Sequence, residues 1–93
     1  MNVIMYNNPN TFIIFFTPEC NYCKKALSLL RNNNVSFKSY NINLISGGLP
    51  NLLAILNRNS HFINFNPAHR TKPIIFYNGK YIGGYSELEQ MLH

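Results

Sequence analysis

The order of apolar and polar positions predicts alternating strands and helices in the first half of the chain. An unbroken apolar run, residues 12–16, is typical of a strand buried on both faces of a sheet. The next apolar side chains follow helical spacing, with polar residues mostly on the other side: Cys23, Ala26, Leu27 and Leu30. We expect this helix to end at Asn32–Asn34, because asparagine tolerates the left-handed backbone common at helix ends. Apolar residues separated by polar ones over 35–44 then predict a second, parallel strand.

A glycine pair separates this unit from a second helix. Gly47–Gly48 breaks the chain, and Pro50 suits the first turn of a helix whose buried side is Leu52, Leu53, Ile55 and Leu56. Residues 60–69 fit either an extra turn of that helix or a loop anchored by aromatic side chains. At the other end of the chain, residues 3–6 would add a short strand or a helical turn.

A hairpin and a short helix complete the pattern. Asn78–Gly79 separates two β-rich runs, 73–77 and 80–82, and this pair favours a type I′ hairpin turn. Ser86 and Glu89 fit a capping box that opens a last helix, whose inward side chains are Leu88, Met91 and Leu92. The order is therefore β-α-β-α-β-β-α. It indicates an α/β protein with a thioredoxin-like fold, in which helices flank a mixed four-stranded sheet.

Composition indicates a small globular protein and argues against nucleic acid and membranes as partners. The chain has 93 residues, 46% of them hydrophobic, which suits a single domain over residues 1–93. Its net charge of +5 reflects a shortage of acids, and the basic residues form no stripe, so we expect no nucleic acid partner. A positive field would still draw anionic small molecules. We see no signal peptide and no run long enough to span a bilayer, and expect a cytoplasmic monomer with no membrane partner.

Cys20 and Cys23 form a C-x-x-C pair at the turn from the buried strand into the first helix. Unpaired N–H groups and the helix dipole stabilise a thiolate there, so we expect Cys20 to be the nucleophile. Cys23, on the apolar face of the helix, would be the more buried partner and would resolve a mixed disulfide. Two cysteines are too few for a disulfide framework, and a reducing compartment would let the pair cycle. The residues alone therefore favour thiol–disulfide exchange.

Two other interpretations of the cysteine pair stay open at this point, a zinc site and two unrelated buried thiols. A closed zinc site needs four ligands, and the three histidines have no regular ligand spacing: His61, His69 and His93. We expect His61 and His69 to be ordinary loop or surface residues. We therefore assign no metal ligand from the residues themselves.

Three separated motifs make the chain resemble the glutaredoxins, here the dithiol type of the thioredoxin superfamily, from Thr11 to Leu92. The motifs are Thr17–Cys23, Arg70–Pro73 and Ile82–Leu88. They place a tyrosine before the second cysteine, a Thr-x-Pro before the hairpin and a Gly-Gly before the last helix. The resemblance implies a glutathione-dependent oxidoreductase that reduces protein disulfides and protein–glutathione mixed disulfides. Its partners would be glutathione, as co-substrate, and disulfide-containing or glutathionylated proteins.

The resemblance also implies roles for individual residues. Cys20 would be the nucleophile, Cys23 the resolving thiol, and Pro73 a cis-proline facing the active site. The backbone of Lys72 would pair with the cysteinyl part of glutathione, and residues 84–86 would receive its γ-glutamyl end at a helix N-terminus. The implied glutathione-binding residues are Thr17, Tyr22, Thr71, Lys72, Pro73, Gly84, Tyr85 and Ser86.

Four positions depart from the family pattern. Thr17 stands where a lysine or arginine commonly holds a glutathione carboxylate, and Lys72, in place of the usual valine, would supply the missing charge. Lys72→Ala should then weaken the use of glutathione, and Thr17→Lys should improve it. Glu87 is one methylene longer than the usual acid, which leaves its contact with the ligand amine open. Asn21 replaces a frequent proline.

The change from proline to Asn21 raises a second class of function. Family members without that proline sometimes bind a [2Fe–2S] cluster between two subunits, with glutathione supplying the other thiolates. Cys20 would then be the protein ligand of the metal. A thioredoxin-like electron donor that does not use glutathione, and a redox-inert adaptor, are further alternatives.

Overall fold

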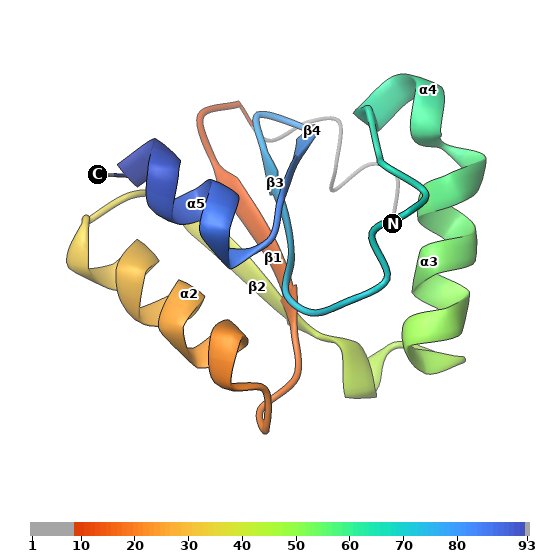
Figure 1. Ribbon diagram of the computed structural model, residues 1–93, viewed down its shortest axis with the longest axis horizontal. Helices are drawn as coiled ribbons and strands as arrows, with labels where there is room; N and C mark the ends of the chain where they lie inside the picture. Colours follow the sequence, from red (N-terminus) through yellow and green to blue (C-terminus); the bar gives the residue numbers. More distant parts are fainter. Residues whose placement is uncertain (1–8, 93) are drawn as a thin grey trace.

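The structure is a computed structural model that describes residues 9–92, so the segment expected at residues 3–6 lies outside the described residues. Its centre is a four-stranded sheet in the order β2-β1-β3-β4 (Figure 1). The strands are β1 (Phe12–Phe16), β2 (Phe37–Asn41), β3 (Ile74–Tyr77) and β4 (Lys80–Gly83). β1 pairs with β2 in parallel, whereas β1 with β3 and β3 with β4 are antiparallel. The mixed sheet and the thioredoxin-like order of elements are as predicted.

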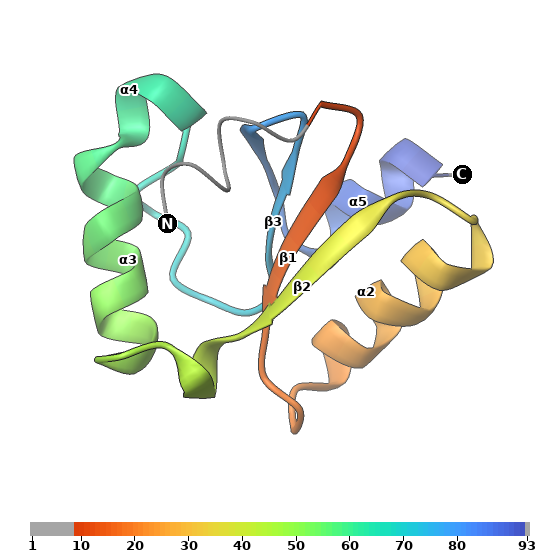
Figure 2. The same cartoon turned by 180° about the vertical axis from the view of Figure 1, so that it is seen from behind.

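The helices form a layer on each face of this sheet. α2 (Asn21–Asn32) and α5 (Tyr85–Leu92) cover one face, and α3 (Gly48–Arg58) and α4 (Ser60–Ile63) cover the other (Figures 1 and 2). Side chains of successive strand residues point to opposite faces, so both layers need apolar residues from the same strand. Accordingly, Ile13 and Phe15 pack in the core under α3, and Phe12 and Ile14 in the core under α2 and α5. This explains why the first strand has no polar position.

The second strand is shorter than the predicted range 35–44. It ends at Asn41, the residue that pairs with the last residue of β1, and a 3₁₀ helix, η1 (Ile42–Leu44), follows. The side chain of Asn41 accepts a hydrogen bond from the N–H of Asn43 at 2.9 Å and caps this turn. Leu44 is consequently 83% exposed instead of lying in the sheet.

The structure combines the two alternatives expected for residues 60–69, an extra helical turn followed by a loop. After Asn59, α4 adds one helical turn that ends at Ile63 and is capped by Asn64, whose φ of 59° is left-handed. The chain then continues as a loop whose anchor, Phe65, is only 4% exposed. Pro50 lies in the first turn of α3, as expected, although the helix begins at Gly48. The loop therefore starts from a fixed point in the core and leads directly to β3.

The hairpin prediction is confirmed and the capping box is wrong. Asn78 and Gly79 have φ values of 57° and 79°, as a type I′ turn requires. α5, however, begins at Tyr85, and the N–H of Gly84 donates to Glu87 Oε1 at 2.8 Å. Glu87, two residues earlier than expected, therefore caps the helix, and Ser86 lies within it.

The buried side of α5 also differs in one residue from the prediction. Leu88 is fully buried, and Tyr85 and Leu92 pack against the same core. Met91, expected to point inward, is 47% exposed. Positions 85, 88 and 92 follow one stripe along the helix, and residue 91 falls at its edge.

Candidate active site

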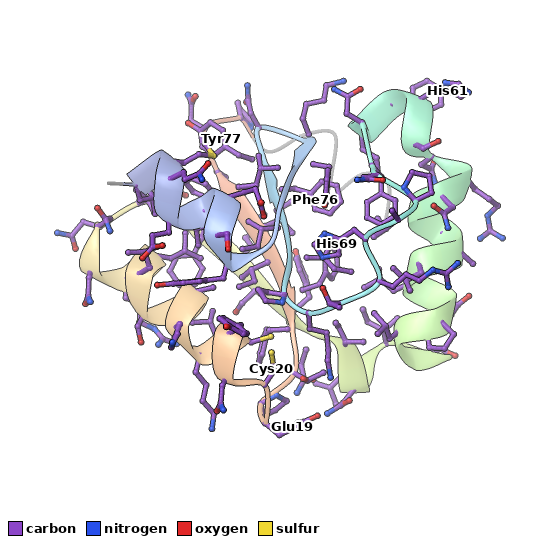
Figure 3. The ribbon with its side chains drawn as sticks, viewed as in Figure 1. Glu19, Cys20, His61, His69, Phe76 and Tyr77 are labelled. Carbon is purple, nitrogen blue, oxygen red and sulfur yellow. The ribbon has the colours of Figure 1, made fainter. Side chains whose placement is uncertain are left out.

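Cys20 occupies the N-cap of α2, directly after the turn that follows β1. Its backbone is extended, with φ −82° and ψ 118°, and its N–H donates to the carbonyl of Thr17 at 3.2 Å. The Cys20 Sγ accepts a hydrogen bond from the N–H of Cys23 at 3.2 Å. Figure 3 shows Cys20 at this end of the helix, beside the turn that carries Glu19. An N–H group aimed at sulfur, at the positive end of a helix dipole, favours negative charge on that sulfur.

Cys23 lies in a different environment although it is only three residues away. Both cysteines are free thiols, but Cys20 is partly exposed whereas Cys23 is fully buried. Burial raises the pKa of the Cys23 thiol from 9.0 to about 12, with a further contribution from its hydrogen bond with Cys20. Cys23 therefore keeps its proton at neutral pH, while Cys20 is the accessible sulfur.

A second segment faces this pair. The peptide bond between Lys72 and Pro73 is cis, which confirms the expectation for Pro73. The Cys20 Sγ lies 3.7 Å from the carbonyl oxygen of Lys72, to which the thiol form donates. The loop before β3 and the start of α2, some fifty residues apart in the chain, therefore meet at one sulfur atom.

A cleft of about 320 Å³ adjoins this contact. Its lining comprises Tyr22, His69, Thr71, Lys72, Pro73, Gly84, Tyr85, Ser86 and Glu87. All of the implied glutathione-binding residues except Thr17 are among them. Their contact with glutathione stays a prediction, but the structure brings them together from α2, the loop before β3 and the start of α5.

Thr17 is buried and is absent from the lining of the cleft. It is 3% exposed, and among the described residues its Oγ1 has no hydrogen-bond partner. Its backbone forms a hydrogen bond with the Cys23 thiol, which partly opposes the effect of burial on the pKa of Cys23. Thr17 thus belongs to the support of the two thiols, and its side chain does not reach the lining of the cleft.

Two residues of the lining were not assigned to the site from the sequence. His69, expected to be an ordinary histidine, is half-buried, and both of its ring nitrogens have partners, among them the hydroxyl of Tyr81. Glu87, whose contact was left open, lines the cleft while its Oε1 accepts from Gly84. No spacing rule marks His69, because its partner Tyr81 comes from another element. His61 differs, since it is exposed at the far end of the molecule on α4 (Figure 3).

An aromatic and basic rim borders the cleft on the side of α2. Tyr22 is 59% exposed, and its ring centroid lies 5.9 Å from that of Tyr85. The Nζ of Lys25 lies 5.3 Å from the centroid of the Tyr22 ring, within the range of a cation–π contact. Together with Lys72 in the lining, this rim gives the entrance positive charge.

Within residues 9–92, no group of three or more histidine, cysteine or acidic side chains could hold a metal ion. A cluster ligated partly by glutathione needs only the Cys20 thiolate from each subunit, so that alternative stays a prediction. Over the same residues, each helix is too short or too polar to cross a bilayer.

Comparison with known proteins agrees with this geometry. The family model described as glutaredoxin matches residues 12–82. A "probable glutaredoxin" of Acanthamoeba polyphaga mimivirus is 55% identical over 85 residues, 91% of this chain and 80% of that protein. The mitochondrial glutaredoxin-2 of Mus musculus is 27% identical over 82 residues, 88% of this chain but 47% of its own length, so the chain spans about half of that relative.

A solved structure extends the comparison to three dimensions. The dithiolic glutaredoxin 2-C-Grx1 of Trypanosoma brucei brucei superposes with a TM-score of 0.73 at 27% identity, covering 97% of this chain and 82% of that one. The residues matched by the family model include the cysteine pair, the cis-proline loop and the first three residues of β4. The chain belongs to the glutaredoxin family of thiol oxidoreductases.

Proposed function

We propose that this protein is a glutathione-dependent thiol–disulfide oxidoreductase in which Cys20 is the nucleophile and Cys23 the resolving thiol. One observation carries the proposal. The partly exposed Cys20 Sγ accepts the N–H of Cys23 at a helix start, next to the Lys72 carbonyl and the cleft, while Cys23 is buried and protonated. Only Cys20 has both access to a substrate and a place at the positive end of a helix dipole.

The one-thiol route begins with a protein–glutathione mixed disulfide. The Cys20 thiolate attacks the glutathione sulfur, the mixed disulfide breaks, and the protein leaves as a thiolate that takes up a proton. Cys20 is now joined to glutathione. A second glutathione, as thiolate, attacks the glutathione sulfur of this intermediate and leaves as oxidised glutathione, which regenerates the Cys20 thiolate. Two glutathione sulfurs thus end in one disulfide, and the protein substrate gains the two electrons.

The lining of the cleft suits a glutathione moiety at that sulfur. The backbone of Lys72 lies beside Cys20, where it would pair with the cysteinyl part of the ligand as the family resemblance implies. The start of α5, at Tyr85 and Ser86, presents N–H groups of a first helical turn, which attract a carboxylate. The Lys72 ammonium adds a positive charge to the same lining. An anionic tripeptide therefore finds complementary groups along the cleft.

The two-thiol route would serve protein disulfides. Attack of Cys20 on the substrate disulfide gives a mixed disulfide, and Cys23 then displaces the substrate thiolate by forming the Cys20–Cys23 bond. The N–H of Cys23 already lies 3.2 Å from the Cys20 Sγ, so the helix keeps the two residues close. Because its pKa is raised to about 12, Cys23 must lose its proton as it attacks. Two glutathione molecules then reduce the Cys20–Cys23 disulfide.

The test compares wild type, Cys20→Ser and Cys23→Ser in two assays coupled to glutathione reductase. The substrates are a glutathione mixed disulfide and a protein disulfide. We expect Cys20→Ser to abolish both activities. Cys23→Ser should retain the first and lose about tenfold or more of the second, because it lacks only the resolving thiol.

Three results would contradict the proposal: activity in Cys20→Ser, loss of both activities in Cys23→Ser, or no activity in wild type. In the last case, visible absorbance after anaerobic purification with glutathione would favour the cluster-binding dimer. Reduction by thioredoxin reductase would instead favour the electron donor that does not use glutathione.

A further inference from the structure

His69 connects the loop of the cleft to the sheet behind it. Its Nε2 lies 2.9 Å from the carbonyl oxygen of Thr71 and 3.2 Å from that of Pro73. Its Nδ1 forms a hydrogen bond with the hydroxyl of Tyr81, which belongs to β4. Figure 3 shows His69 between the sheet and the loop that leads to β3. One side chain therefore has partners both on β4 and on the loop that leads to β3.

These partners allow only one arrangement of protons on the neutral ring. A carbonyl oxygen can only accept, so Nε2 must carry the hydrogen and share it between Thr71 and Pro73. Nδ1 is then an acceptor, and the hydroxyl of Tyr81 donates to it. Burial raises the pKa of Tyr81 above its ordinary value, so this hydroxyl keeps its proton. The tautomer of His69 is thus fixed by three contacts.

The two carbonyls are those on either side of Lys72. The Lys72 carbonyl is the group that the Cys20 Sγ contacts at 3.7 Å. Tyr81 is itself fixed, because its ring packs edge-on against Phe76 in the core, with centroids 5.9 Å apart. The position of the Lys72 backbone relative to Cys20 therefore depends on a path that runs from the sheet through Tyr81 and His69.

We propose that His69 is a positioning residue that holds the Thr71–Pro73 backbone in register with Cys20 and thereby sets the affinity for the glutathione part of the substrate. The inference rests on the proposed function. Because both ring nitrogens already have partners, His69 acts through the loop and not by its own hydrogen bond to the ligand. It takes no part in the thiol–disulfide exchange itself.

The experiment compares His69→Gln, His69→Phe and Tyr81→Phe in the mixed-disulfide assay. Glutamine keeps an N–H donor near the place of Nε2, whereas phenylalanine keeps the ring volume and removes both nitrogens. For His69→Phe we expect the KM for the mixed disulfide to rise about tenfold, with kcat within about twofold of wild type. His69→Gln should stay within about twofold of the wild-type KM. Tyr81→Phe, which removes only the hydroxyl, should fall between them.

A packing role would give another pattern. If His69→Gln raised KM as much as His69→Phe did, or if His69→Phe left KM unchanged in an active protein, the proposal would be overturned. An inactive wild type would instead count against the proposed function itself. Should His69→Phe fail to fold, Tyr81→Phe decides, since an unchanged KM in that variant contradicts the connection to β4.

A second measurement needs no glutathione. Long-range ¹H–¹⁵N spectra of the histidine rings report which nitrogen carries the proton. We expect the Nε2–H tautomer for the neutral His69 ring in wild type. A ring protonated at Nδ1 could not donate to the Thr71 and Pro73 carbonyls through Nε2, and this result would overturn the inference whatever the activity.

Discussion

The two segments that meet at the Cys20 sulfur are built in different ways. Residues 17–23 make their contacts locally, through the N-cap of α2 and the N–H of Cys23. Residues 69–73 obtain their position from far along the chain, through the hydrogen bond of His69 to Tyr81. The first segment places the reactive sulfur, and the second segment contributes His69, Thr71, Lys72 and Pro73 to the lining of the cleft beside it.

This difference separates reactivity from recognition. At the start of α2, the two thiols are only three positions apart, but one lies at the partly exposed N-cap and the other in the core. Their reactivity therefore differs. In the loop, the groups that would contact a ligand are largely backbone, and their placement depends on side chains behind them. Substitutions in the first segment should therefore change which thiol reacts, and substitutions in the second should change how well a substrate binds.

The sharpest expected contrast lies within the first segment, between the two thiols. With its pKa raised from 9.0 to about 12, Cys23 has a thiolate fraction roughly a thousandfold below that of an ordinary cysteine at neutral pH. Alkylation of the native protein with iodoacetamide should therefore give one adduct, on Cys20, by mass spectrometry. The same reaction in denaturant should give two. Equal labelling of both cysteines in the folded state would contradict this contrast.

The same shift in pKa predicts how stability depends on pH. The folded state holds the Cys23 proton more tightly than the unfolded state does, so this contribution is complete below pH 9.0 and is lost as the pH rises toward about 12. Cys23→Ala removes it. The difference in unfolding free energy between wild type and Cys23→Ala should therefore shrink over this range, and a constant difference would speak against the raised pKa.

Lys72 tests recognition in the second segment. Its ammonium lines the cleft, so Lys72→Ala should raise the KM for a glutathione mixed disulfide about fivefold, or about 1 kcal/mol, with less effect on kcat. The effect should diminish as salt is added, because partly exposed charges are screened. Lys38→Ala, at an exposed lysine of β2, is the matched control. If the two variants behaved alike, the charge of Lys72 would have no local role.

The sequence was sufficient wherever one segment determines its own structure. The apolar run of β1, the Asn78–Gly79 turn and the cysteine pair at a helix start all depend on neighbours in the chain, and all three are present as predicted. The grouping of the cleft residues came from the family resemblance, which carries the long-range information that patterns lack.

The sequence predictions are wrong where contacts with distant residues decide between structures that the local sequence allows. The second strand stops at Asn41 because its partner β1 ends there, although the apolar pattern continues. Ser86 and Glu89 satisfy a capping pattern, yet the helix begins one residue before Ser86 and Glu87 takes the cap. For His69, the deciding partner is Tyr81, which lies in another element and outside the local pattern around residue 69.

Substitution of Thr17 has the smallest expected effect of these tests. It is also the one for which the structure reverses the expected result. The sequence suggested that Thr17→Lys would improve glutathione use. At 3% exposure, however, a lysine would have to bury its ammonium or displace the turn that precedes Cys20, so we expect a loss of stability.

Thr17→Val is the better probe. It replaces a buried hydroxyl that has no partner among the described residues by a methyl group of similar size. We expect a gain of about 1 kcal/mol in unfolding free energy, measured by denaturant titration, with unchanged KM for the mixed disulfide. A raised KM would show that the hydroxyl serves the ligand after all, and that recognition in the first segment extends beyond Tyr22, which lines the cleft.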